Sequence, residues 1–184
     1  LYSKTETGDL QFEILRNDTM NTTMGGSSGT KISFDPVKLW VDESTPNQSN
    51  VSAYVALTGE TVNITDAYEE AGFDFSGTKS YDQKTGYRSQ SFLTVPLKNH
   101  ENEIIGVMQL INARDENGRV VSFDADMQEQ IESLASQGAV ALTNKKLVGE
   151  LKTLFEAFIQ LIATAIDKKS EYTGGHCSRV PVIT

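Results

Sequence analysis

Two apolar runs that flank a short polar turn constrain this chain more than any other feature. In the first run Leu93, Val95 and Leu97 occupy alternate positions, the period of a strand with one buried face. Pro96 has no amide donor, so we expect this strand to lie at or near a sheet edge, or to be bulged there. The polar segment 98–103 predicts a turn, and the two runs together predict a hairpin.

The second run, residues 104–111, carries apolar side chains on both of its predicted faces. A strict two-residue period assigns Ile104, Met108 and Leu110 to one face and Ile105, Val107 and Ile111 to the other. A strand that is apolar on both faces is covered on both sides. We therefore expect a layer on each side of the sheet, and one side could hold a closed ligand pocket.

The N-terminal part of the chain predicts a hairpin followed by loops. Residues 1–4 are typical of the end of a strand, and residues 10–16 alternate as a half-buried strand. Residues 17–30 are polar and rich in glycine, which predicts a mobile loop. Residues 32–40 look like a strand interrupted by proline, and residues 42–50 predict a second polar loop.

Two short helices are predicted between these loops and the central hairpin. Residues 50–58 carry apolar side chains at helical spacing and are followed by Gly59, a typical helix end. Residues 61–64 predict a short strand. Residues 76–84 predict a second helix, which ends at Gly86.

Residues 124–167 predict one nearly continuous helix without proline. Its first half has the apolar stripe of a helix that packs on a sheet. Its second half has apolar residues at alternating four- and three-residue steps, a heptad pattern. The pattern favours a parallel homodimer over packing on a downstream domain. The predicted seam residues are Leu147, Leu151, Leu154, Phe158, Leu161 and Ala165.

Composition narrows the class of partner. The net charge of −9 argues against a nucleic-acid surface, which needs clustered Lys and Arg, and against binding to an anionic membrane. Cys177 is the one cysteine, so an intrachain disulfide is excluded and a reducing, cytoplasmic location is expected. No apolar run approaches the ~20 residues that span a membrane.

Two segments carry a family resemblance: VNITDAY at 62–68 and TGYRSQSFLTVPLKNHENEIIGVMQLIN at 85–112. They resemble the GAF domain, the small-molecule sensor module of cyclic-nucleotide phosphodiesterases and many bacterial signalling proteins. The resemblance implies an α+β fold in residues 1–146, with the first helix of the domain missing at the N-terminus. It implies an antiparallel sheet with helices packed on one face, a ligand-sized cavity on the other and a long C-terminal helix.

The resemblance also implies a ligand site. In cyclic-nucleotide-binding GAF domains, positions that match six residues of this chain line or face the ligand: Val51, Ser52, Thr78, Asp82, Thr85 and Ser89. From the residues alone, Asp82 and Thr85 are equally consistent with ordinary turn chemistry beside Gly86. The expected ligand is a cyclic nucleotide or another small molecule, and no cofactor is expected.

The chain departs from a second motif of the phosphodiesterase GAF domains. Asn112 and Phe123 match the motif, but Ala113 stands where the family has Lys, and Met127-Gln128 stands where it has Asp-Glu. The Lys–Asp salt bridge of that motif cannot form in this chain.

The segment AIDKKSEYTGGHCSRV, residues 165–180, resembles the opening of a bacterial HD-type phosphohydrolase domain of the HD-GYP kind. The resemblance implies a linker helix at 147–167 and the start of a truncated HD-type domain at 168–184. His176 would be a metal ligand only in a complete HD domain, and one imidazole is not a metal site. We therefore expect no metal site and no catalytic residues in this sequence.

The expected function is regulatory. The GAF domain would sense a small molecule and control a downstream metal-dependent, HD-type cyclic-di-GMP phosphodiesterase (EC 3.1.4) in bacterial signal transduction, through a dimeric linker helix. The alternative is a ligand-free dimerisation spacer, which predicts a filled sheet face in place of the cavity.

Overall fold

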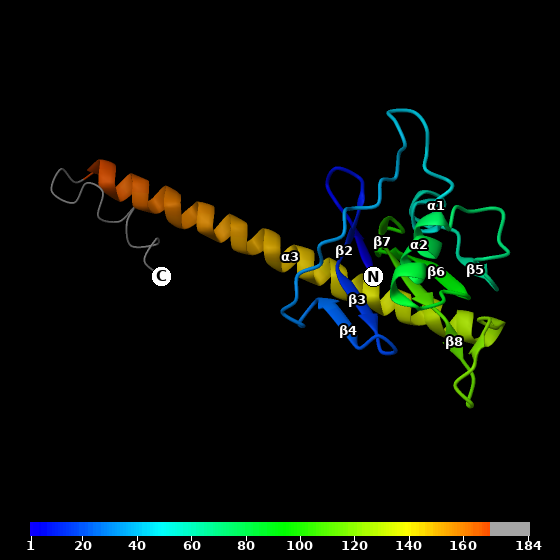
Figure 1. Cartoon of the computed structure of the whole chain (residues 1–184). Helices are drawn as coiled ribbons and strands as arrows, with labels where there is room; N and C mark the ends of the chain where they lie inside the picture. The colour runs from blue at the N-terminus through cyan, green and yellow to red at the C-terminus, as the bar shows by residue number, and fades with distance from the viewer. Residues whose placement is uncertain (170–184) are drawn as a thin grey trace. The chain divides into compact units, whose positions relative to one another are not determined.

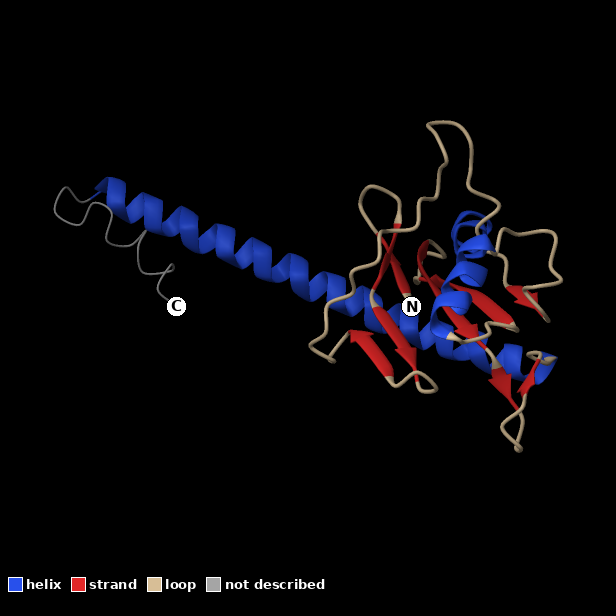
Figure 2. Ribbon diagram, viewed as in Figure 1, coloured by secondary structure: helices blue, strands red, loops and turns tan. Residues whose placement is uncertain are grey.

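The computed structural model describes residues 1–169 of the chain. These residues belong to two compact units, Leu1–Leu142 and a second unit that begins at Thr143. The first unit contains a five-stranded antiparallel sheet in the order β2-β1-β7-β6-β5 (Figures 1 and 2). Its strands are β1 (Tyr2–Lys4), β2 (Leu10–Phe12), β5 (Val62–Ile64), β6 (Phe92–Lys98) and β7 (Ile104–Ile111).

The predicted central hairpin is confirmed, and the position of Pro96 has a clear physical reason. Strand β6 pairs with β7 along its whole length, but it pairs with β5 only from Phe92 to Thr94. Pro96 therefore lies beyond the end of β5, where no ladder hydrogen bond needs its missing amide donor. The β6–β7 register shifts one residue later, between Leu97 and Lys98.

This register shift changes which way the start of β7 faces. Ile105 is the extra residue of the bulge and packs beside Met108, under α3. Ile104 lies instead next to Gly59, the residue after α1. The predicted grouping of Ile104 with Met108, and of Ile105 with Val107, is therefore wrong, because a bulge interrupts the alternation of faces.

A layer covers each face of the sheet, as the apolar pattern of β7 predicts. On one face Ala135 and Ala139 of α3 (Ala125–Lys169) pack on Val95 and Leu97 of β6. On the other face α1 (Val51–Thr58) packs against β1 and β7, with Ala53 and other small side chains fully buried. The α+β fold class is confirmed, and α1 and α2 lie on the side that also holds the cavity described below.

Local sequence signals explain the helix ends. The side chain of Asn50 accepts a hydrogen bond from the amide of Ala53 and caps α1, and Gly59 ends it in the left-handed conformation, φ 73°. The second helix, α2 (Ser76–Thr85), ends at Gly86 in the same way. Asp124 caps α3 through the amide of Met127, at 2.8 Å.

The N-terminal part differs most from the expectation. The predicted strand 10–16 divides into β2 and β3 (Ile14–Asn17), which belong to different sheets. The predicted mobile loop 17–30 contains β4 (Thr22–Gly25), which pairs with β3 as a separate hairpin. Residues 32–40 contribute only single bridges, Leu10 with Val37 and Trp40 with Pro46. Another short pair, β8 (Ala113–Arg114) and β9 (Val120–Val121), follows β7.

The second unit consists, as far as the structure describes it, of the rest of α3. Leu147, Leu151, Leu154, Phe158 and Leu161 are all exposed by more than half. No helix within the described residues is both long enough and apolar enough to cross a membrane.

Candidate functional site

A cavity of about 750 Å³ lies in the first unit, on the α1 side of the sheet. Strands β1, β2 and β7 form its floor, α2 forms one side, and the β3–β4 hairpin forms another. Residues far apart in sequence, from Leu1 to Arg114, meet there. A concave site of this size between a sheet and a helix is typical of small-molecule binding.

One wall of the cavity is a row of aromatic rings. Tyr2 and Phe12 have ring centroids 4.5 Å apart, and Phe34 follows with its centroid 5.5 Å from that of Phe12. Tyr81 and Tyr87 line the cavity from α2 and from the segment after it. Such rings offer flat apolar surface for stacking against a planar ligand.

Gln109 of β7 organises the polar part of the floor. Its Nε2 donates to Ser52 Oγ at 3.3 Å and to Thr94 Oγ1 at 3.2 Å, and its Oε1 accepts from the Tyr2 hydroxyl at 3.4 Å. Burial raises the pKa of Tyr2 above its ordinary value, because the ionised phenol would be desolvated. The sequence prediction missed Gln109, although it is the one polar side chain in the otherwise apolar strand β7.

Asn112 closes the inner end of the cavity with a left-handed backbone, φ 61°. Its Oδ1 accepts from the amide of Gln90 at 2.7 Å, and its Nδ2 donates to Tyr87 Oη at 2.9 Å and to the Arg88 carbonyl at 2.7 Å. Asn112 therefore holds Tyr87 and the segment before β6 in place.

A side-chain amide on β5 joins one motif position that matches the phosphodiesterase pattern to one that departs from it. Asn63 Nδ2 donates to the carbonyl of Phe123 at 3.0 Å and to Gln128 Oε1 at 3.1 Å. This neutral pair of bonds ties β5 to the start of α3, near the place where the family motif has acidic residues.

The structure places two of the six predicted site residues in the cavity wall, Thr78 and Ser89. Asp82 lies behind Ser89: its carboxylate accepts from the Ser89 amide at 2.7 Å and the Ser89 hydroxyl at 2.9 Å. The Tyr68 hydroxyl donates to the same carboxylate at 2.9 Å. Desolvation, and then this hydrogen bond, raises the pKa of Tyr68.

The other three predicted residues lie outside the cavity wall. Val51 is buried in an apolar cluster with Phe92, and Ser52 is buried on α1 beneath Gln109. Thr85 is exposed and donates to the carbonyl of Tyr81 within α2. Whether any of the six contacts a ligand stays a prediction.

Two guanidinium groups lie among the cavity residues. Arg16 on β3 forms an ion pair with Asp18 at 2.8 Å, and Arg114 on β8 donates to Thr19 Oγ1 at 3.0 Å. The first turn of α2 contributes Gly77 and Thr78. First-turn amides have no acceptor inside their own helix. The cavity thus combines aromatic surface with groups that donate hydrogen bonds.

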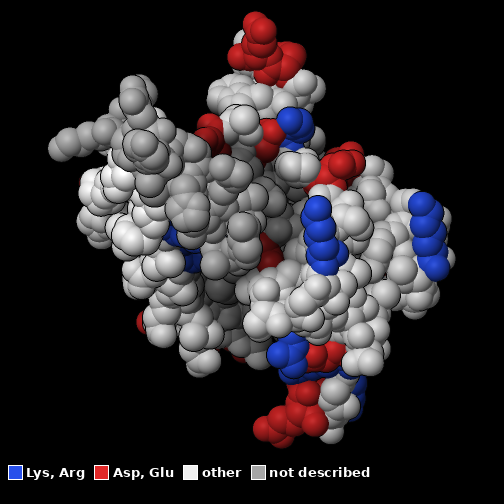
Figure 3. Space-filling model, turned by 90° about the vertical axis from the view of Figure 1, so that its left-hand side faces the viewer, with Lys and Arg blue, Asp and Glu red and all other residues white. Residues whose placement is uncertain are grey.

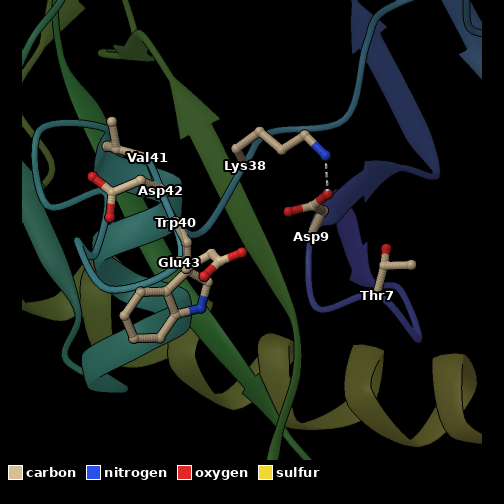
Figure 4. Close-up of a pocket in the computed structure, with 7 residues that line it drawn as sticks. All are labelled: Thr7, Asp9, Lys38, Trp40, Val41, Asp42 and Glu43. Carbon is tan, nitrogen blue, oxygen red and sulfur yellow. Dashed lines mark hydrogen bonds and ion pairs between the residues drawn. The ribbon is translucent and has the colours of Figure 1, made fainter.

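A second, more open depression lies at the turn between β1 and β2 (Figure 4). Lys38 forms an ion pair with Asp9 across it, at 2.5 Å, and Trp40 and Glu43 lie on its other side. On the face drawn in Figure 3, basic side chains are separated by acidic and neutral ones.

Among the described residues, no group of three or more His, Cys, Asp or Glu side chains is placed to hold a metal ion. His176 and Cys177 lie outside the described residues.

Comparisons with known proteins agree with this architecture. A profile of the GAF domain family matches residues 20–142. The chain is 31% identical over 128 residues to the dual 3′,5′-cyclic-AMP and -GMP phosphodiesterase 11A of Takifugu rubripes, covering 70% of this chain and 13% of that protein. It is 41% identical over 71 residues to the dual 3′,5′-cyclic-AMP and -GMP phosphodiesterase 11 of Drosophila melanogaster, covering 39% of this chain and 5% of that protein.

The chain therefore spans a small part of the length of these curated relatives. Among solved structures, the GAF domain of an Acinetobacter phosphoenolpyruvate-protein phosphotransferase is similar, with a TM-score of 0.50 and 16% identity. That similarity covers 81% of this chain and 72% of the other, and it shows the fold alone. The family profile ends at residue 142, before the HD-type resemblance begins. The chain belongs to the GAF domain family.

Proposed function

We propose that this GAF domain binds a small planar, anionic molecule in the cavity on the α1 side of its sheet. The observation that carries the proposal is the cavity itself, about 750 Å³ with aromatic rings along one wall. A spacer that binds no ligand has no need of an unfilled sheet face. An unfilled sheet face destabilises the fold, because it lacks the van der Waals contacts that packed side chains would supply there.

The arrangement of the lining groups favours a nucleotide. Tyr2, Phe12 and Phe34 provide surface on which a base can stack. Arg16 and Arg114 can pair with a phosphate, since guanidinium groups bind phosphate with charge-assisted hydrogen bonds. The names of the curated relatives include cyclic AMP and cyclic GMP as the molecules that those enzymes act on. Cyclic nucleotides are therefore the first ligands to test.

The test is calorimetric titration of the protein with cyclic AMP and cyclic GMP, with two variants that make the same chemical change on one helix. Thr78→Ala removes a hydroxyl from the cavity wall, whereas Thr85→Ala removes one from the exposed side of α2. We expect Thr78→Ala to weaken binding about five- to tenfold, the loss of one hydrogen bond, and Thr85→Ala to leave it unchanged. Absence of binding by both nucleotides, together with no small molecule in protein purified from its host, would refute the proposal.

We propose further that the domain regulates an HD-type, cyclic-di-GMP phosphodiesterase carried by the same protein. The resemblance of residues 165–180 to the start of such a domain supports this, as does the heptad pattern between Leu147 and Ala165. The exposed apolar row in α3 supports a dimeric linker helix as the route of control. Ligand binding would shift the register or rotation of this seam, which requires different affinities for the two states.

Hydrogen exchange in residues 147–165 tests this coupling. A saturating nucleotide should change the exchange of these amides if the seam has two arrangements. Unchanged exchange in the seam, in a protein that demonstrably binds the nucleotide, would exclude the coupling and leave the ligand site intact.

A further inference from the structure

The β3–β4 hairpin is a part of the cavity wall with no residue in the buried core of the first unit. It forms a two-stranded sheet of its own, outside the five-stranded sheet. Six consecutive residues, Ile14 to Thr19, line the cavity. None of the buried core clusters of the described chain includes a hairpin residue, and Ile14 is 41% exposed. Segments with few buried apolar contacts are the first to open in a folded protein.

The hairpin is well bonded within itself. Four residue pairs join β3 to β4, from Ile14 with Gly25 to Asn17 with Thr22. At the tip, Asn17 Oδ1 accepts from the amide of Met20 at 3.0 Å. These bonds hold the hairpin together as a body, so it can move without unfolding.

The base of the hairpin has the geometry of a hinge. Its two ends meet at Glu13 and Gly26, where the Gly26 amide donates to the Glu13 carbonyl at 3.0 Å. Gly25 and Gly26 both have positive φ, 73° and 54°. Glu13 also donates its amide to the Leu1 carbonyl at 2.9 Å, and the Ile14 carbonyl accepts from the Leu1 amino group at 2.9 Å, so both bonds anchor the base to the residue before β1.

Two polar contacts from opposite walls of the cavity hold the tip of the hairpin. Arg114 on β8 donates Nη2–H to Thr19 Oγ1 at 3.0 Å, and Tyr81 on α2 directs its hydroxyl at Met20 Sδ at 4.0 Å. Both contacts are at the surface, and sulfur is a weak acceptor. Arg114 and Tyr81 also line the cavity. A ligand that reached either side chain would therefore touch the same groups that hold the tip.

We infer that the β3–β4 hairpin is a lid over the cavity, hinged at Glu13 and Gly25–Gly26 and latched by Arg114 and Tyr81. The inference rests on the proposed function, because it states how ligand entry to that site is controlled. An open lid exposes the aromatic wall to solvent, and a closed lid returns Arg16 to the cavity, where Arg114 of β8 already lies.

Hydrogen exchange on the free 184-residue chain tests the lid with two isosteric variants of one hairpin. Thr19→Val removes the oxygen that Arg114 binds, whereas Thr23→Val makes the same change at an exposed position of β4 with no assigned partner outside the hairpin. We expect Thr19→Val to raise amide exchange in residues 14–25 about three- to tenfold, the effect of one lost hydrogen bond, and Thr23→Val to leave it unchanged. The β6–β7 amides serve as the internal reference and should not change.

A thiol in the cavity provides a second readout. In a Cys177→Ser background, Thr78→Cys places one thiol in the cavity wall, and N-ethylmaleimide should modify it several-fold faster when Thr19→Val is added. Equal exchange and equal labelling in the Thr19→Val and Thr23→Val proteins would overturn the lid. Both measurements use protein without ligand, so their failure leaves nucleotide binding untouched. If the protein does not bind nucleotides, the nucleotide proposal fails, but the measured opening of the hairpin still stands.

Discussion

The carboxylate of Asp82 is the most heavily bonded acidic side chain near the cavity. It is 3% exposed and accepts from three donors, two on Ser89 and one on Tyr68. Because Ser89 lines the cavity and Asp82 does not, Asp82 acts on the site by positioning its neighbour. A buried carboxylate is tolerated here because hydrogen bonds replace its hydration.

We expect Asp82→Ala to lower the free energy of unfolding by about 2–3 kcal/mol, because the buried Ser89 amide and hydroxyl lose their acceptor. Ligand binding should be lost while dimerisation is retained. Urea unfolding measures the first effect, and Gln83→Ala, one residue later on the exposed side of α2, is the control. Equal stability of the two variants would contradict this role for Asp82.

Tyr2 predicts an alkaline limit to stability. Burial raises its pKa in the folded protein above the ordinary value of 10.0, so the unfolded state loses the phenolic proton first. The contribution of Tyr2 to stability is therefore complete below pH 10.0 and declines as the pH rises above it, by at most about 1.4 kcal/mol per pH unit.

Comparison with Tyr2→Phe isolates this effect. The variant lacks the ionisable group, so its unfolding free energy should fall less steeply between about pH 9 and pH 11. Parallel pH profiles for the two proteins would show that Tyr2 does not titrate in this way.

At the scale of elements, the sequence predicted what depends on local pattern. Gly59 and Gly86 mark helix ends through chemistry contained in a few residues, and those ends are confirmed. The caps formed by Asn50 and Asp124 are equally local. The strand pattern of β6 and the apolar run of β7 also required only neighbouring residues. The prediction of one buried face for β6 is wrong, because Phe92 and Thr94 are buried as well as Leu93, Val95 and Leu97.

The features that the sequence did not reveal depend on distant partners. The bulge at Ile105 follows from how β7 meets β6, and β4 lies in a polar, glycine-rich segment that carries no strand pattern of its own. The aromatic wall exists because β1 pairs with β2 so that Tyr2 faces Phe12. Family resemblance pointed to Thr78 and Ser89, but no spacing rule could place Gln109 in the same cavity.

The pairing of β7 with β1, on the sheet that α3 covers, depends on close backbone approach at Gly106. A methyl group there would lie 2.2 Å from the Tyr2 carbonyl oxygen and 3.2 Å from Leu142 and Leu97 side-chain carbons. We expect Gly106→Ala to destabilise the first unit by about 3 kcal/mol, since backbone atoms cannot yield as side chains do.

The matched substitution Gly138→Ala should have the opposite effect and raise the free energy of unfolding. In α3 the nearest atom to the added methyl is the flexible end of Met108, at 3.4 Å, an ordinary contact. Replacement of a glycine by alanine inside a helix should stabilise the folded state by about 0.5–1 kcal/mol. Thermal unfolding of the two variants compares them, and similar effects of both would disprove this reading of the sheet–helix contact.

At the scale of the whole molecule, the exposed apolar row in the second unit is the observation behind the proposed dimer. Leu147, Leu151, Leu154, Phe158 and Leu161 keep more than half of their surface in solvent, although each would gain about 1.5–3 kcal/mol from full burial. The heptad spacing of this row suits a second copy of the same helix.

Leu154→Glu tests this association. Two copies of the new carboxylate would face each other across the proposed seam, so we expect the protein to become monomeric at concentrations where the wild type is dimeric. Sedimentation velocity measures the change. Gln160→Glu adds the same charge at a polar position off the seam and should leave the mass unaltered, whereas a Leu154→Glu protein of unchanged mass would count against the dimer.

The bulge at Ile105 has a practical consequence for engineering. It absorbs the change of register between the regular β6–β7 ladder and the turn that begins after Lys98. Extra residues inserted near His100, where the chain is exposed, would thus lengthen only the part of the hairpin beyond the irregularity. A fluorophore or epitope grafted at this position should label the domain without displacing the strands that form the floor of the cavity.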